Sequence, residues 1–256
     1  MKNLFATAAS IFVLGFAVPA LAQSSTSKVD QIGTNNGVTV DQIGITSVND
    51  SKIKQGLDPA NYSSSYNRAT VTQDGSNVLK NTSKIDQDGY DNHATATQGG
   101  NGSGGDTNDS VIDQGGASNY VTVTQGNAQE DNDSRVKQSG TANWATVDQG
   151  GPAEGISFNN ISLIDQSGYG NEAHVHQGGG GAADNFSKIT QGDLYGLGGD
   201  NYALVNQHGL SDNESTILQD GTLNGATIDQ NSAINVSNIS ILTQLGWSNS
   251  ATVKQH

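Results

Sequence analysis

The stretch QSGTANWATVDQ, residues 138–149, carries the pattern that decides the fold of this chain. A glutamine stands at each end of it, and the sequence contains nine such pairs, of which seven are 11 residues apart. Because a fixed period marks a structural unit that is repeated and stacked, the pairs define nine repeats. The paired glutamines are Gln31 and Gln42, Gln55 and Gln73, Gln87 and Gln98, Gln114 and Gln125, Gln138 and Gln149, Gln166 and Gln177, Gln191 and Gln207, Gln219 and Gln230, and Gln244 and Gln255.

Other residue types keep a fixed distance from these glutamines. Val or Ile lies two residues before 16 of the 18 glutamines, and a Ser lies four residues before the first glutamine of every pair. Chance does not place one residue type at one offset in all nine repeats, so these positions belong to the structural unit. An Asn also lies six residues before the second glutamine of every pair, at Asn36, Asn67, Asn92, Asn119, Asn143, Asn171, Asn201, Asn224 and Asn249.

The spacing between the fixed positions predicts β-strands. Each half-repeat reads N-x-(S/A)-x-(V/I)-x-Q, and positions two residues apart share one face of a strand. The β-branched residue marks that face as the interior, so Asn, Ser or Ala, and Gln are expected to point inward with it. A linker of the form Q-x-G-x-x-N joins the two halves in seven of nine repeats, and its Gly allows the positive φ of a turn.

These features together predict an all-β fold. A two-stranded hairpin is marginal in water, whereas coiling places each strand about 4.8 Å above its copy in the next repeat. We therefore expect a β-solenoid of nine strand–turn–strand repeats that forms two stacked parallel sheets of the amyloid type. Identical amides then lie above one another, and each donates a hydrogen bond to one neighbour and accepts one from the other. The eighteen glutamines and nine asparagines named above are the predicted stacking ladder.

The N-terminus has the pattern of a secretory signal peptide. Residues 1–22 contain Lys2, then the apolar run Leu4 to Val18, and then an Ala-x-Ala site that ends at Ala22. The chain has no Cys, so disulfides do not hold it together. We expect an exported protein with no transmembrane span in the mature chain. Residues 23–256 form the repeat domain, with repeats at about 25–42, 49–73, 81–98, 108–125, 132–149, 160–177, 185–207, 213–230 and 238–255.

The repeat resembles the curlin repeat of curli, the extracellular amyloid fibres of bacterial biofilms. The matching pattern is Q-x-G-x-x-N-x-A-x-x-x-Q, and the resemblance covers residues 25–256. The familiar major subunit has Ser six residues before the first glutamine, where eight of the nine repeats here have Asn, and here the Ser stands four residues before it. The two half-repeats therefore look alike, which is closer to the minor, nucleating subunit. The pattern is intact at residues 87–98, 138–149, 166–177, 219–230 and 244–255.

The resemblance implies a secreted subunit that assembles into pilus-like cell-surface fibres for adhesion and biofilm formation. Its implied partners are copies of itself through end-to-end strand stacking, other curli subunits and an outer-membrane secretion apparatus. The family carries an N-terminal targeting stretch, and here only residues 23–26 precede the first repeat. The alternative is a monomeric solenoid binding module, such as a surface adhesin or an ice-binding protein with a flat Thr array. The complete motif at residues 249–255 favours polymerisation, because monomeric solenoids cap their end strands.

Other functional classes find little support in the sequence. There is no nucleophile elbow, phosphate loop or Cys/His pair, so we expect no catalytic residues, no cofactor and no enzyme activity. The formal charge of −14 opposes nucleic-acid binding. His174 and His176 lie on one strand face, but zinc needs three or four ligands and no third ligand is identifiable. Two insertions, at residues 57–66 and 192–200, are expected to form loops between strands.

Overall fold

The computed structural model describes ten segments of the chain. The predicted signal peptide, residues 1–22, lies outside the described residues, as do residues 57–64 and 193–198 of the two insertions. No described residue is helical, so this part of the chain contains no helix that could cross a membrane. The described segments are 25–43, 48–56, 65–74, 80–99, 107–126, 131–150, 158–178, 184–192, 199–233 and 236–256.

The first strands of the repeats form one parallel sheet. Nine strands follow one another in the order β1-β3-β5-β7-β9-β11-β13-β15-β17, so each strand pairs with its counterpart in the next repeat. Their bounds are β1 Thr26–Gln31, β3 Val48–Gln55, β5 Lys80–Gln87, β7 Thr107–Ala117, β9 Asp131–Thr141, β11 Phe158–Tyr169, β13 Asp184–Gly192, β15 Asn213–Thr222 and β17 Asn238–Trp247.

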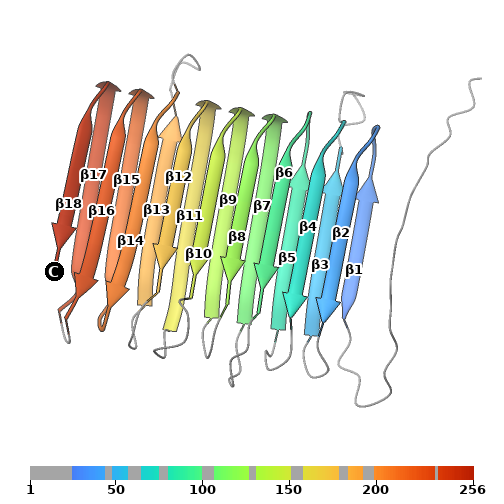
Figure 1. Ribbon diagram of the computed structural model, residues 1–256, viewed down its shortest axis with the longest axis horizontal. Coiled ribbons are helices and arrows are strands. Elements are labelled where there is room, and N and C mark those ends of the chain that lie inside the picture. Colours follow the sequence, from blue (N-terminus) through green and yellow to red (C-terminus); the bar gives the residue numbers. More distant parts are fainter. Residues whose placement is uncertain are drawn as a thin grey trace, which may run out of the picture.

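The second strands of the repeats form the other parallel sheet, again of nine strands. The chain advances along the long axis from β1 and β2 at one end to β17 and β18 at the other (Figure 1). The predicted two-sheet β-solenoid is therefore confirmed. The bounds of the second strands are β2 Gly37–Ile43, β4 Arg68–Asp74, β6 His93–Gln98, β8 Tyr120–Gln125, β10 Trp144–Gln149, β12 Glu172–Gln177, β14 Tyr202–Gly209, β16 Gly225–Ser232 and β18 Ser250–Gln255.

The register places identical motif positions above one another. Between β8 and β10, Val123 pairs with Val147 and Gln125 pairs with Gln149. The aliphatic side chains form one continuous core between the sheets, and Val147 is fully buried in it. A slip of one residue would turn every Val and Gln to the outer face, so the buried pattern holds the register. At the ends of the stack Val29 and Val253 are only partly buried.

The linkers between paired strands are hydrogen-bonded arcs rather than isolated tight turns. After the glutamines, Gly116 pairs with Gly140 in the same parallel register as the strands. Gly140 has φ of 104° and Ala142 has φ of 57°, and this pair of positive angles turns the chain into the second sheet. The positive φ of the Gly was predicted from the sequence, whereas the positive φ of the residue directly before the Asn was not.

Gly140 and Gly115 provide a matched test of this arc. A Cβ at Gly140 would overlap the carbonyl oxygen of Gly168 in the next repeat, whereas a Cβ at Gly115 would meet nothing within 4 Å. Gly140 also has a positive φ. We expect Gly140→Ala to destabilise the fold by about 3 kcal/mol and Gly115→Ala by less than about 1 kcal/mol, measured by chemical denaturation. Equal effects of the two substitutions would contradict this account of the arc.

Candidate functional site: buried amide ladders

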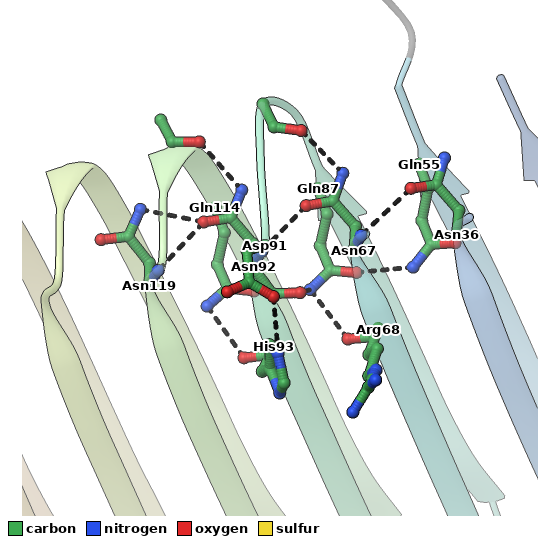
Figure 2. Close-up of polar contacts among 12 residues, drawn as sticks. Asn36, Gln55, Asn67, Arg68, Gln87, Asp91, Asn92, His93, Gln114 and Asn119 are labelled. Carbon is green, nitrogen blue, oxygen red and sulfur yellow. Dashed lines mark hydrogen bonds and ion pairs between the residues drawn. The ribbon is translucent and has the colours of Figure 1, made fainter. Parts of the chain in front are cut away.

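The glutamines of the first sheet form an unbroken hydrogen-bonded ladder in the described residues. The Nε2 of Gln87 donates to the Oε1 of Gln114 at 2.8 Å, and Gln114 donates in the same way to Gln138 at 3.0 Å. Figure 2 shows the rungs formed by Gln55, Gln87 and Gln114. The ladder runs through Gln31, Gln55, Gln87, Gln114, Gln138, Gln166, Gln191, Gln219 and Gln244.

The second sheet holds a matching ladder. Gln125 donates to Gln149 at 3.0 Å, and Gln149 donates to Gln177 at 3.0 Å. Both ladders therefore donate toward the C-terminal end of the stack. The members of the second ladder are Gln42, Gln73, Gln98, Gln125, Gln149, Gln177, Gln207, Gln230 and Gln255.

Backbone carbonyls fix the orientation of these amides. The Nε2 of Gln87 also donates to the carbonyl oxygens of Arg68 and Asn92, each at 3.0 Å. A backbone carbonyl accepts but never donates, so the nitrogen of this side chain must face it. Gln114 makes the equivalent bond to the carbonyl of His93 at 3.0 Å (Figure 2). Each of these glutamines thereby ties the first sheet to the second, as well as one repeat to the next.

The asparagines at the start of the second strands form a third ladder with the opposite direction. The Nδ2 of Asn143 donates backward to the Oδ1 of Asn119 at 3.1 Å, and Asn171 donates backward to Asn143 at 3.0 Å. The backbone N–H of Asn143 also donates to Asn119, which fixes the position of the oxygen. The side-chain ladder runs through Asn92, Asn119, Asn143, Asn171, Asn201, Asn224 and Asn249. Toward the N-terminal end, the backbone N–H groups of Asn67 and Asn92 donate to the Oδ1 atoms of Asn36 and Asn67 and extend the row.

A fourth ladder, which was not predicted from the sequence, lies in the first sheet. Here Asn132 donates backward to Asn108 at 3.0 Å, and Asn160 donates backward to Asn132 at 3.0 Å. The sequence pattern that could have predicted this ladder is the Asn that stands six residues before the first glutamine in eight of nine repeats. Its members are Asn49, Asn81, Asn108, Asn132, Asn160, Asn185, Asn213 and Asn238.

The serines of the first sheet stack without satisfying one another. In the described residues, seven of their hydroxyls are buried and have no hydrogen-bond partner. A hydroxyl bond needs about 2.8 Å, and the short Ser side chain does not bridge a strand spacing of about 4.8 Å. The equivalent positions of the second sheet carry Ala or Val instead. The seven serines are Ser51, Ser83, Ser110, Ser134, Ser162, Ser187 and Ser215.

The histidines of the second sheet contact carboxylates on its outer face. The Nε2 of His174 lies 2.6 Å from the Oε1 of Glu172, and the Nδ1 of His176 lies 3.2 Å from the Oδ2 of Asp148. The hydrogen bond to Asp148 raises the pKa of His176, against the opposing effect of burial. The rings of His176 and His208 are 5.2 Å apart. Among the described residues, no group of three or more His, Cys, Asp or Glu side chains is arranged to hold a metal ion.

The outer face of the second sheet also carries rows that follow the register. Thr39 pairs with Thr70, and Thr122 pairs with Thr146, but His174 follows Thr146 in the same row. Beside this row the rings of Tyr120 and Trp144 lie 5.0 Å apart. The aromatic contacts had no periodic signal in the sequence.

Comparisons with known proteins add no family assignment. No family model matches the chain, and a search of curated proteins finds no match either.

Gln138 and Ser134 are both buried on β9, and substitutions at them should have opposite effects. Gln138→Ala removes the acceptor of Gln114 and the donor to Gln166, so we expect a loss of about 3 kcal/mol. Ser134→Ala removes an unpartnered hydroxyl and should stabilise the fold by about 1 kcal/mol. Chemical denaturation of both variants checks the pair. A destabilising Ser134→Ala would reveal a partner for the hydroxyl.

Proposed function

We propose that this protein is an exported structural subunit that stacks end to end with copies of itself into extracellular fibres of the curli type. The fibres would serve adhesion and the biofilm matrix. Following the resemblance of the repeat, other curli subunits and an outer-membrane secretion apparatus are the further proposed partners. The observation that carries this proposal is the state of the end strands.

The end strands of both sheets lack the second neighbour that every inner strand has. In the described residues β1 and β2 pair only with β3 and β4, and β17 and β18 pair only with β15 and β16. Strand edges of this kind accept further strands. In the described residues the two Gln ladders also end there, because Gln244 and Gln255 accept from Gln219 and Gln230 but donate to no further glutamine. A second copy stacked on either end would bury Val29 or Val253 and extend the ladders.

The sequence of the repeat supports the same function. The curlin-like pattern spans residues 25–256, and residues 1–22 have the composition of a cleaved export signal. Export through a membrane suits a chain without cysteines, whose stability is expected to come from stacking.

Assembly of the purified residues 23–256 tests the proposal. After dilution from denaturant, we expect thioflavin fluorescence to rise after a lag and unbranched fibres to appear by electron microscopy. Fibre diffraction should give reflections near 4.7 Å and 10 Å, which are the strand and sheet spacings. A folded monomer that persists at high concentration without fibres would instead favour the solenoid binding module.

Stacked carboxylates make the assembly sensitive to pH. Asp86 lies in register with Asp113, and Asp109 lies in register with Asp133. Burial raises the pKa of Asp86, and Asp88 and Asp113 raise it further. Burial also raises the pKa of Asp109, with a smaller contribution from Asp133. Asp86 and Asp109 are therefore protonated in the folded stack at pH values at which they are still ionised in the unfolded chain. The folded stack consequently gains stability relative to the unfolded chain as pH falls through the raised pKa values toward the ordinary value of 3.8.

We expect the lag before fibre formation to shorten as pH is lowered from 7 to 4.5 at low salt. The doubly substituted variant Asp86→Asn/Asp109→Asn should show a flatter dependence, because it lacks two carboxylates with raised pKa values. Thioflavin kinetics of both proteins in parallel make the measurement. If the lag depends on pH equally in the natural chain and in the variant, then Asp86 and Asp109 do not cause the pH dependence of assembly.

A further inference from the structure

We propose that the two ends of the stack carry matched outward side chains that select one junction between copies of this chain. At this junction β1 of one copy pairs with β17 of the other, and β2 pairs with β18. Ile32 then meets Leu245, and Asp41 meets Lys254. This inference rests on the proposed function, and it adds the register of the junction and the residues that set it.

The register follows from positions that the stack repeats. Leu245 stands one residue after its ladder glutamine and pairs with Asp220 at the same position of the preceding repeat. Ile32 stands one residue after Gln31, and its N–H donates to the carbonyl of Gln55. Continuation of the first sheet by one more strand therefore places Ile32 beside Leu245. The neighbouring strands would be about 4.8 Å apart, as they are within the chain.

Within the chain, neither Ile32 nor Leu245 has an aliphatic neighbour at the position directly after the ladder glutamine of the adjacent repeat. The pairs found there include Gly115 with Ser139 and Gly192 with Asp220. Ile32 is 51% exposed and Leu245 is 65% exposed, so both keep much of their apolar surface in water. Contact between the two side chains would remove part of that surface, and the described stack offers it only where two ends meet.

The second sheet has a charge match at the same junction. Asp41 and Lys254 both stand one residue before a ladder glutamine, and they pair within the chain with Thr72 and Asp229 respectively. Stacking β2 on β18 sets the Asp41 carboxylate beside the Lys254 ammonium. Such a pair steers encounter and disfavours wrong partners more than it adds affinity.

The ladders continue in their own register only through a head-to-tail junction. Gln230 donates to Gln255, so the C-terminal end offers an amide N–H of Gln255 to a further copy. Asn249 donates backward to Asn224, so the same end offers the Asn249 oxygen. The end with Gln42 and Asn36 offers the complementary oxygen and N–H groups. Two C-terminal faces would meet with their strands antiparallel, so that Gln would lie beside Asn. Only the head-to-tail junction continues the parallel register in which Gln stacks on Gln and Asn on Asn.

Cysteine cross-linking tests the register directly, because the natural chain has no Cys. In preformed fibres of the variant Ile32→Cys/Leu245→Cys, a mild oxidant should link successive copies into a covalent series of dimers, trimers and longer chains. The expected Cα separation of about 4.8 Å lies within disulfide range. An intramolecular bond is excluded in the folded chain, whose two ends are about 38 Å apart, eight strand spacings of about 4.8 Å.

The matched control is Ile43→Cys/Leu245→Cys. Ile43 is also an Ile that follows a ladder glutamine and is 50% exposed, but it belongs to the second sheet. The sheets are about 10 Å apart, beyond the reach of a disulfide, so no covalent series is expected. Equal cross-linking of both variants, or cross-linking of the control alone, would contradict the proposed register of the junction but not the proposed assembly into fibres. Failure of the natural chain to form fibres would overturn the proposed function and the junction together.

A charge reversal covers the case in which the cysteine variants do not assemble. The variant Asp41→Lys/Lys254→Asp places a second carboxylate beside Asp229 within the chain, so its elongation of its own seeds is the reference for its elongation of natural seeds. It should elongate natural seeds about threefold or more slowly at low salt, because both possible junctions then bring like charges together. Asp148→Lys, in the same row at mid-stack, should elongate natural seeds at the natural rate. If the variant Asp41→Lys/Lys254→Asp elongates natural seeds as fast as its own seeds, the proposed pairing of Asp41 with Lys254 is refuted.

Discussion

The hydrogen bond between stacked glutamine side chains is the interaction on which the rest of this structure depends. A buried amide costs several kcal/mol when it is unpaired, and the narrow space between two sheets admits few partners. The neighbouring repeat supplies the partner, as Gln138 does for Gln114 at 3.0 Å. That solution works only if every repeat keeps the same residue at the same height. The strict recurrence of Gln and Asn in the sequence is the direct consequence of this geometry.

The direction of the ladders follows from the backbone. Carbonyls such as that of Arg68 orient the Gln nitrogens, and N–H groups such as that of Asn143 orient the Asn oxygens. The Gln ladders therefore donate toward the C-terminal end and the Asn ladders toward the N-terminal end. Their dipoles oppose one another along the axis. A stack of many repeats consequently builds up little net side-chain dipole, while each of its ends keeps a distinct set of donors and acceptors.

The sequence predicted the fold and most of the ladders because their signal is periodic. Strand period, inward face and register all follow from residues such as Val147 and Gln149, which recur at fixed offsets. The rest lacked such a signal. The positive φ before each Asn occurs at Ala142 and Leu223 alike, so residue type did not mark it. The unpartnered hydroxyl of Ser134 was also beyond a sequence argument, since the recurring Ser reads as another stacked polar group.

A uniform interior creates a problem of specificity that the outer face has to solve. Nearly every rung presents the same Asn, Val or Ile, and Gln to any other rung, so the ladders alone would accept many incorrect junctions. Within the chain the linkers prevent such slips, but between chains they do not act. Discrimination must then come from positions that differ between repeats, and those point outward. Lys254 and Asp41 differ from the residues at the same positions of their neighbouring repeats, Asp229 and Thr72. Variation at outward positions therefore distinguishes one junction from another, which the uniform interior residues do not do.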